Sequence, residues 1–204
     1  MPSCLYCGAK GNTVEHVPPR SFLEKPFPRN LSTVRACTRC NQSFSKDEEY
    51  FRNLICNFAL ESSPDANILF DTKIKRSIQR KPALANSLFQ QMQLVDFVTE
   101  GGIHVETKTK ITIPAEDRKR IENVITKYAK GLFYQHFGKI MPEDHIIKMA
   151  WSIQDKKLFP LISEIKPTKL FSNIFAYGLG YVPDTYNWAW LLLFFKKVPF
   201  LVFT

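Results

Sequence analysis

The chain has 204 residues, of which 45% are hydrophobic and 23% charged, a mixture typical of a globular protein and not of a disordered one. Its formal charge of +9 predicts attraction to polyanions such as nucleic acid, although this charge alone excludes no class of soluble protein. An odd number of cysteines and no signal peptide argue against a secreted disulfide scaffold. Because the longest apolar run, residues 188–195, is too short to span a bilayer, we expect a soluble, cytoplasmic protein without a membrane partner.

The N-terminal part of the chain contains two Cys-x-x-Cys pairs, Cys4/Cys7 and Cys37/Cys40. Thiolates at this spacing are typical of a tetrahedral zinc site, and four of them leave no open position on the ion. The sequence therefore predicts a structural Zn²⁺ site. A redox dithiol is disfavoured because the first pair has no strand-to-helix context, and Cys56 is expected to be a small buried hydrophobe.

A helix is predicted over residues 45–60, because apolar side chains recur there at helical spacing and Ser45 with Glu48 has the pattern of a capping box. The turn signal Ser62-Ser63-Pro64-Asp65 ends it. We place a domain boundary at this turn. Residues 1–62 would form the zinc-stabilised module, and residues 63–204 an α+β domain for substrate or partner binding.

The second part of the chain alternates between helical and strand patterns, which predicts an α+β fold with an antiparallel sheet. Its expected elements, in chain order, are a helix over 74–92 interrupted or started by Pro82, a hairpin of 94–99 with 103–113, a helix over 114–137, a strand within 145–153, a short helix over 154–165, and three antiparallel strands from 171 to the end.

The loop between the two cysteine pairs carries Glu15-His16-Val17-Pro18-Pro19 and Asn30-Leu31, and the second pair runs directly into Asn41. In this order the motifs resemble the HNH endonucleases of the ββα-metal type, in the subgroup with a four-cysteine zinc. The resemblance covers about residues 1–58 and implies a ββα-metal fold there. Residues 60–204 contribute nothing to it.

The resemblance implies a role for each of four residues. His16 would be the general base that takes a proton from the attacking water. Glu15 and Asn41 would hold one Mg²⁺ or Mn²⁺ ion through their oxygen atoms. Asn30 would pin the loop that carries His16.

The chain departs from the family pattern at two places. Members often carry Asp where this chain has Glu15, and the family places Lys at the position of Phe44, whereas here Lys46 comes two positions later. Whether Lys46 or Arg39 contacts phosphate, and whether Asp47 joins the active site, is left open. For Asp47 we expect solvent exposure.

Basic residues gather just after the domain boundary, where a nuclease needs phosphate contacts. This run, which an ordinary solvated helix face would explain equally well, consists of Lys73, Lys75, Arg76, Arg80 and Lys81.

Taken together, these features predict a divalent-metal-dependent DNA endonuclease, in a restriction, mobile-element or phage-defence context. A monomer would nick DNA and a homodimer, which is left open, would cut both strands. Two alternatives are a non-catalytic zinc module that binds nucleic acid or protein, and a nuclease that acts on RNA.

Overall fold

The computed structural model describes residues 2–142, 148–150, 164–182 and 187–204. It is a mixed α+β structure with antiparallel sheets, as the sequence predicts. Its helical elements are η1 (Arg20–Phe22), α1 (Thr38–Ser43), α2 (Ser45–Ala59), α3 (Pro64–Leu69), the π-helical turn η2 (Phe70–Ile74), α4 (Lys75–Arg80), α5 (Pro82–Gln90) and α6 (Ala115–Phe137). Its strands are β1 (Thr13–Val17), β2 (Ser32–Ala36), β3 (Met92–Val98), β4 (His104–Ile111), β5 (Lys148–Ala150), β6 (Lys169–Phe171), β7 (Phe175–Val182), β8 (Asn187–Phe194) and β9 (Val198–Phe203).

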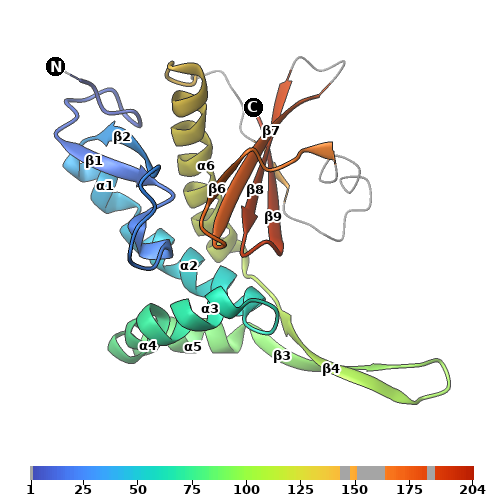
Figure 1. Cartoon of the computed structure of the whole chain (residues 1–204). Coiled ribbons are helices and arrows are strands. Elements are labelled where there is room, and N and C mark those ends of the chain that lie inside the picture. Colours follow the sequence, from blue (N-terminus) through green and yellow to red (C-terminus); the bar gives the residue numbers. More distant parts are fainter. Residues whose placement is uncertain (1, 143–147, 151–163, 183–186) are drawn as a thin grey trace.

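The strands form three antiparallel sheets, which are the hairpin β1–β2, the hairpin β3–β4 and a five-stranded sheet in the order β5-β9-β8-β7-β6. Figure 1 shows the hairpin β1–β2 on one side of α6 and the five-stranded sheet on the other, with α2 crossing below. The hairpin β3–β4 points away from the rest of the molecule (Figure 1). The helix α6 therefore separates the N-terminal hairpin from the large sheet.

One aromatic cluster joins these layers at the centre of the core. Phe51 on α2 lies 5.2 Å from Phe194 on β8, measured between ring centroids, and Tyr128 on α6 lies 6.3 Å from both Phe51 and Phe22. All four side chains are fully buried. The core is thus continuous across position 62, and the division into two domains stays a prediction from the sequence.

Most predicted elements are confirmed. The helix predicted over 45–60 is α2, and the hairpin predicted around Gly101 is β3–β4. Pro82 is the first residue of α5, so it starts a helix as predicted. The long helix is α6, and β7, β8 and β9 are the three predicted C-terminal strands. Within 145–153 the structure describes only β5, and almost all of the helix predicted over 154–165 lies outside the described residues.

The capping box predicted at the start of α2 is wrong. Phe44 joins α1 to α2 in a helical conformation, so no residue there has the extended backbone of an N-cap. Ser45 Oγ instead donates to the carbonyl oxygen of Gln42 (2.8 Å), and Glu48 turns inward to Lys127. A buried ammonium group from α6 competes for this carboxylate, and no local pattern reveals it.

Candidate functional site: the cysteine cluster and the β1 strand

Four cysteine sulfur atoms gather beside the N-terminal hairpin. All lie within 4.8 Å of one another, and the Sγ atoms of Cys7 and Cys37 are 3.7 Å apart. A tetrahedral zinc–thiolate site has sulfur–sulfur edges of about 3.8 Å, given Zn–S bonds of about 2.3 Å. None of the five cysteines is in a disulfide. The residues Cys4, Cys7, Cys37 and Cys40 therefore fit a metal ion such as zinc.

Two tight backbone turns present these sulfur atoms. In the first, the amide of Gly8 donates to the carbonyl oxygen of Cys4 (2.9 Å), and Gly8 adopts a positive φ of 72°, which favours glycine. In the second, Cys37 caps α1 and its Sγ accepts a hydrogen bond from the amide of Cys40 (3.4 Å). This hydrogen bond lowers the pKa of Cys37 to about 7, which favours the thiolate that a metal requires. Burial raises the pKa of Cys40.

The fifth cysteine lies apart from this cluster, as predicted. Cys56 is fully buried in α2, and its thiol donates to the carbonyl oxygen of Ala66 (3.2 Å). Burial raises its pKa to about 12, so it stays a neutral thiol.

Glu15 and His16 are neighbours on β1, opposite Val34 and Thr33 of β2. Because successive side chains of a strand point to opposite faces, the two residues project to different sides of the hairpin. Glu15 faces inward and is 6% exposed, while His16 is partly exposed. Burial, and then the positive charge of Arg20, lower the pKa of His16, so its imidazole is neutral and able to accept a proton at neutral pH.

The buried side of β1 holds an ion-pair network that crosses to α6. The Nζ atom of Lys127 lies 3.2 Å from Glu15 Oε2 and in closer contact with Glu48 Oε1. Lys127 is 1% exposed, and its ammonium group also faces the ring of Phe44, 5.0 Å from the centroid. Burial raises the pKa of Glu48, and Lys127 opposes that rise. The ammonium group of Lys127 thus forms ion pairs with two buried carboxylates.

Sequence reasoning missed Lys127. It lies 79 positions from Glu48, and the only signal was a lysine within the apolar stripe of the helix over 114–137. Such a lysine is more often read as one whose head group reaches solvent along its long stem.

The two predicted asparagines differ in their placement. Asn41 Nδ2 donates to Thr13 Oγ1 (3.3 Å), and Thr13 shares a face of β1 with Glu15 because the two are separated by one residue. The structure therefore brings Asn41 and Glu15 to the same side of β1, and His16 to the other. Asn30 is exposed, and it makes no hydrogen bond in the described part of the chain. The loop after His16 is held instead by Lys73, which donates to the backbone of Arg20 and Leu23.

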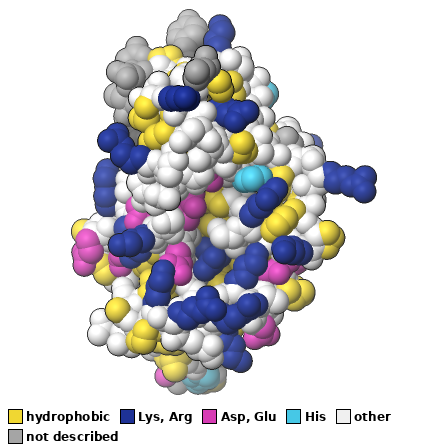
Figure 2. Space-filling view, turned by 90° about the vertical axis from the view of Figure 1, so that its left-hand side faces the viewer, with side chains coloured by type: hydrophobic (Ala, Val, Ile, Leu, Met, Phe, Trp, Pro, Cys, Tyr) yellow, Lys and Arg dark blue, Asp and Glu magenta, His cyan; other side chains and the backbone are white. Residues whose placement is uncertain are grey.

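The predicted phosphate-binding residues fall into two groups. Lys73, which is partly buried, and Lys81, whose side chain is 53% exposed, form ion pairs within the chain, with Glu24 (3.6 Å) and Glu49 respectively. The second group forms no such pair among the described residues and is exposed; it consists of Arg39, Lys46, Lys75, Arg76 and Arg80. Figure 2 views the side of the molecule on which β1 lies, and Lys and Arg side chains gather over much of its lower half. This face could therefore attract a polyanion.

Asp47 does not reach the β1 strand. Its carboxylate contacts Arg120 (3.3 Å) and accepts a hydrogen bond from Asn123 (3.0 Å), both on α6. The expectation that Asp47 points to solvent is wrong, because α6 supplies a cation and an amide at this position.

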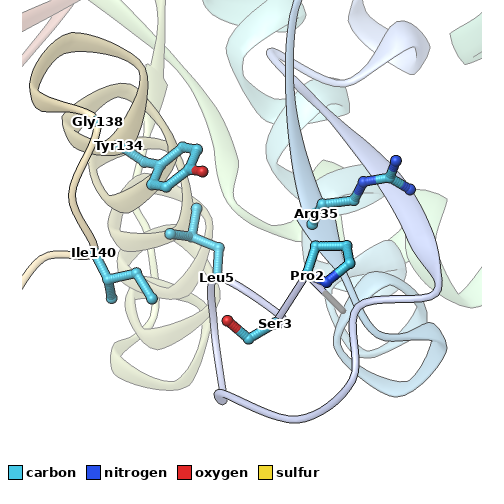
Figure 3. Close-up of a pocket in the computed structure, with 7 residues that line it drawn as sticks. All are labelled: Pro2, Ser3, Leu5, Arg35, Tyr134, Gly138 and Ile140. Carbon is cyan, nitrogen blue, oxygen red and sulfur yellow. The ribbon is translucent and has the colours of Figure 1, made fainter.

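A hollow of about 330 Å³ lies between the N-terminal segment and the end of α6 (Figure 3). Tyr134 and Ile140 line one side and Pro2 and Arg35 the other. It includes none of the residues predicted to be catalytic. We assign it no role.

No family model matches the chain, and neither a curated protein nor a solved structure does. Within the described residues, no helix is long and apolar enough to cross a membrane. The resemblance to the HNH endonucleases therefore depends on the motifs themselves.

Proposed function

We propose that this protein is a zinc-stabilised, divalent-metal-dependent endonuclease of the HNH type that hydrolyses DNA. The observation that carries this proposal is the contact between Asn41 and Thr13 (3.3 Å), which brings the amide to the same face of β1 as Glu15. Asn41 follows the second cysteine pair directly, so a metal held by the four sulfur atoms would hold it against β1. The hairpin β1–β2 followed by α1 also has the order of elements that the family requires.

The residues on β1 and α1 fit a hard divalent cation only in part. Glu15 Oε2 has the ammonium of Lys127 at 3.2 Å and no other hydrogen-bond donor among the described residues, and Asn41 engages its amide nitrogen, which leaves its oxygen for a cation. To bind Mg²⁺ or Mn²⁺, Glu15 would have to turn from Lys127, which keeps Glu48 as its partner. When bound, the ion would neutralise charge on the phosphoryl oxygens and on the departing 3′-oxygen.

His16 would act as the general base. It is partly exposed on the strand, and Arg20 lies near enough to lower its pKa and to attract a phosphate. The exposed basic residues Lys75, Arg76 and Arg80 would hold the DNA backbone. His16 projects to the other face of β1 from Glu15 and Asn41, so this role requires the hairpin to rearrange when substrate binds.

One observation favours a second function, that of a non-catalytic zinc module which binds nucleic acid or protein. Glu15 is 6% exposed and is paired with Lys127, which is 1% exposed. In this buried ion pair the carboxylate of Glu15 already has a structural partner in Lys127 and needs no metal ion. In that case the basic face would remain as a binding surface.

Cleavage of supercoiled plasmid by the zinc-replete protein with Mg²⁺ or Mn²⁺ tests the proposal. We expect nicking, and a loss on the order of 10²-fold or more when His16→Ala removes the base. Asn41→Ala should raise the divalent-ion concentration that is needed for activity. His104→Ala is the matched control, because this histidine is exposed on β4, in another sheet, and its loss should leave nicking unchanged.

The other outcomes discriminate among the alternatives. Intact DNA across several divalent ions, with DNA binding preserved, would favour the zinc-module function. Cleavage of RNA alone would move the substrate from DNA to RNA. Equal activity of wild type and His16→Ala would remove His16 from the mechanism.

A further inference from the structure

The hairpin β3–β4 forms an arm that extends from the body of the molecule (Figure 1). It is a sheet of two strands, so both of its outer edges are open among the described residues. A two-stranded sheet is marginally stable in water, and an open apolar edge is a site for pairing with another chain. Five large hydrophobic side chains of the arm are at least half exposed, namely Leu94 (73%), Phe97 (50%), Val98 (58%), Ile103 (70%) and Val105 (62%).

The charge of the arm shows what kind of partner it fits. Residues 92–111 carry three acidic and two basic side chains, a formal charge of −1, although the whole chain carries +9. A slightly acidic, apolar arm has no attraction for a phosphate backbone. It is also the place where two strongly cationic copies of this chain would meet with the least repulsion.

The two edges differ in what they offer to a second copy. The strand β3 carries a single charged residue, Asp96, so pairing β3 with itself offers no ion pair. The strand β4 carries Glu106 and Lys108 on either side of Thr107. In an antiparallel pairing of two β4 strands about a two-fold axis at Thr107, each Glu106 lies opposite Lys108 of the other copy.

We propose that the arm is a self-association surface, on which β4 of one copy pairs antiparallel with β4 of a second copy about Thr107. The threonines would then face each other, and two Glu–Lys pairs would flank them. The tip of each arm, with Val98 and Ile103, would reach the base of the other arm, where Phe89 at the end of α5 is 61% exposed. This contact would cover apolar surface that the single copy leaves in water.

This inference goes beyond the proposed nuclease activity and does not depend on it. If both hold, the dimer would carry two hydrolytic sites, which is what a cut through both strands of a duplex requires.

Sedimentation velocity of the full-length protein at micromolar concentration tests the inference, without DNA or divalent ions. We expect a dimer for the wild type. The variants E106K and K108E each place two pairs of like charges across the axis, so each should weaken the dimer on the order of tenfold. The control K119E alters a lysine that is exposed on α6, and it should leave association unchanged.

Mixing the two variants gives the decisive result. Glu106 and Lys108 also contact each other within one chain (2.8 Å), and both single variants lose that local pair. Only in a mixed dimer of E106K with K108E do opposite charges face each other across the axis again, so mixing should restore association. A monomeric wild type, a dimer that both variants leave intact, or a mixture that stays monomeric would each overturn the inference.

Discussion

Replacing Lys127 by Met is the sharpest test of the network beneath β1, because Met keeps the stem of the side chain and removes only the ammonium. Lys127 is the shared partner of Glu15 and Glu48, whose side chains are 7% and 11% exposed. Removing one partner of a buried ion pair costs about 3–5 kcal/mol, since it leaves a charge without compensation. We therefore expect Lys127→Met to lower the free energy of unfolding by about this amount at neutral pH.

The cost should depend on pH with a definite sign. Burial already raises the pKa of Glu48, and loss of Lys127 removes an influence that lowers it. When the pKa of a carboxyl group is higher in the folded state than in the unfolded state, the folded state is not penalised below the unfolded pKa. Above that pKa the free energy of unfolding falls as the pH rises. To avoid a buried charge without a partner, the folded variant can keep one of the two carboxyl groups protonated. This costs about 4 kcal/mol at about pH 7.5 but under about 1 kcal/mol at about pH 5. The cost of Lys127→Met should therefore fall to about 1–2 kcal/mol at about pH 5.

Urea denaturation followed by circular dichroism at both pH values measures these costs. Lys119→Met is the matched control, because it makes the same change on α6 at a side chain that is 73% exposed and lies 3.8 Å from Glu122. Its cost should stay below about 0.5 kcal/mol. Adding Glu48→Gln to Lys127→Met should recover part of the loss. Equal costs for the two lysine variants, or a cost for Lys127→Met that is the same at both pH values, would refute the reasoning.

Three further predictions concern the packing, the metal and the basic face. Gly131→Ala on α6 places a Cβ atom 2.6 Å from Val17 Cγ2, so it should cost about 1–2 kcal/mol in thermal or urea unfolding despite the better helix propensity of Ala. Cys40→Ser should abolish stoichiometric zinc, as measured by atomic absorption, and lower the melting temperature. The double variant Lys75→Ala/Arg76→Ala should reduce the salt slope of DNA binding in fluorescence anisotropy by about 2.

Each of these predictions has a control in the same chain. Gly101→Ala meets its nearest atom at 3.9 Å and should cost little, so an equal loss there would remove the packing argument. Cys56→Ala should keep the zinc, because this cysteine lies outside the cluster. Lys73→Ala should lower the free energy of unfolding and leave the salt slope of DNA binding nearly unchanged, since Lys73 is engaged with Glu24 and the loop backbone. A salt slope unchanged in the double variant would exclude that face from DNA binding.

The elements that the sequence predicted well are those with local causes. The helical stripe of α6, the turn residues of the hairpin β3–β4 and the alternating C-terminal strands all depend on residues a few positions apart. The cysteine cluster belongs with them, because each Cys-x-x-Cys pair is one local turn and only a shared metal is needed to join the two.

What only the tertiary structure decided is the use of the charged side chains at the start of α2. Glu48 and Asp47 read as a cap and a solvated acid, but their partners Lys127 and Arg120 lie 79 and 73 positions away. Glu15 is likewise drawn to Lys127 from β1. A buried charge is tolerated only with a partner, and that partner is chosen by which elements pack together, a property that no local pattern of residues encodes.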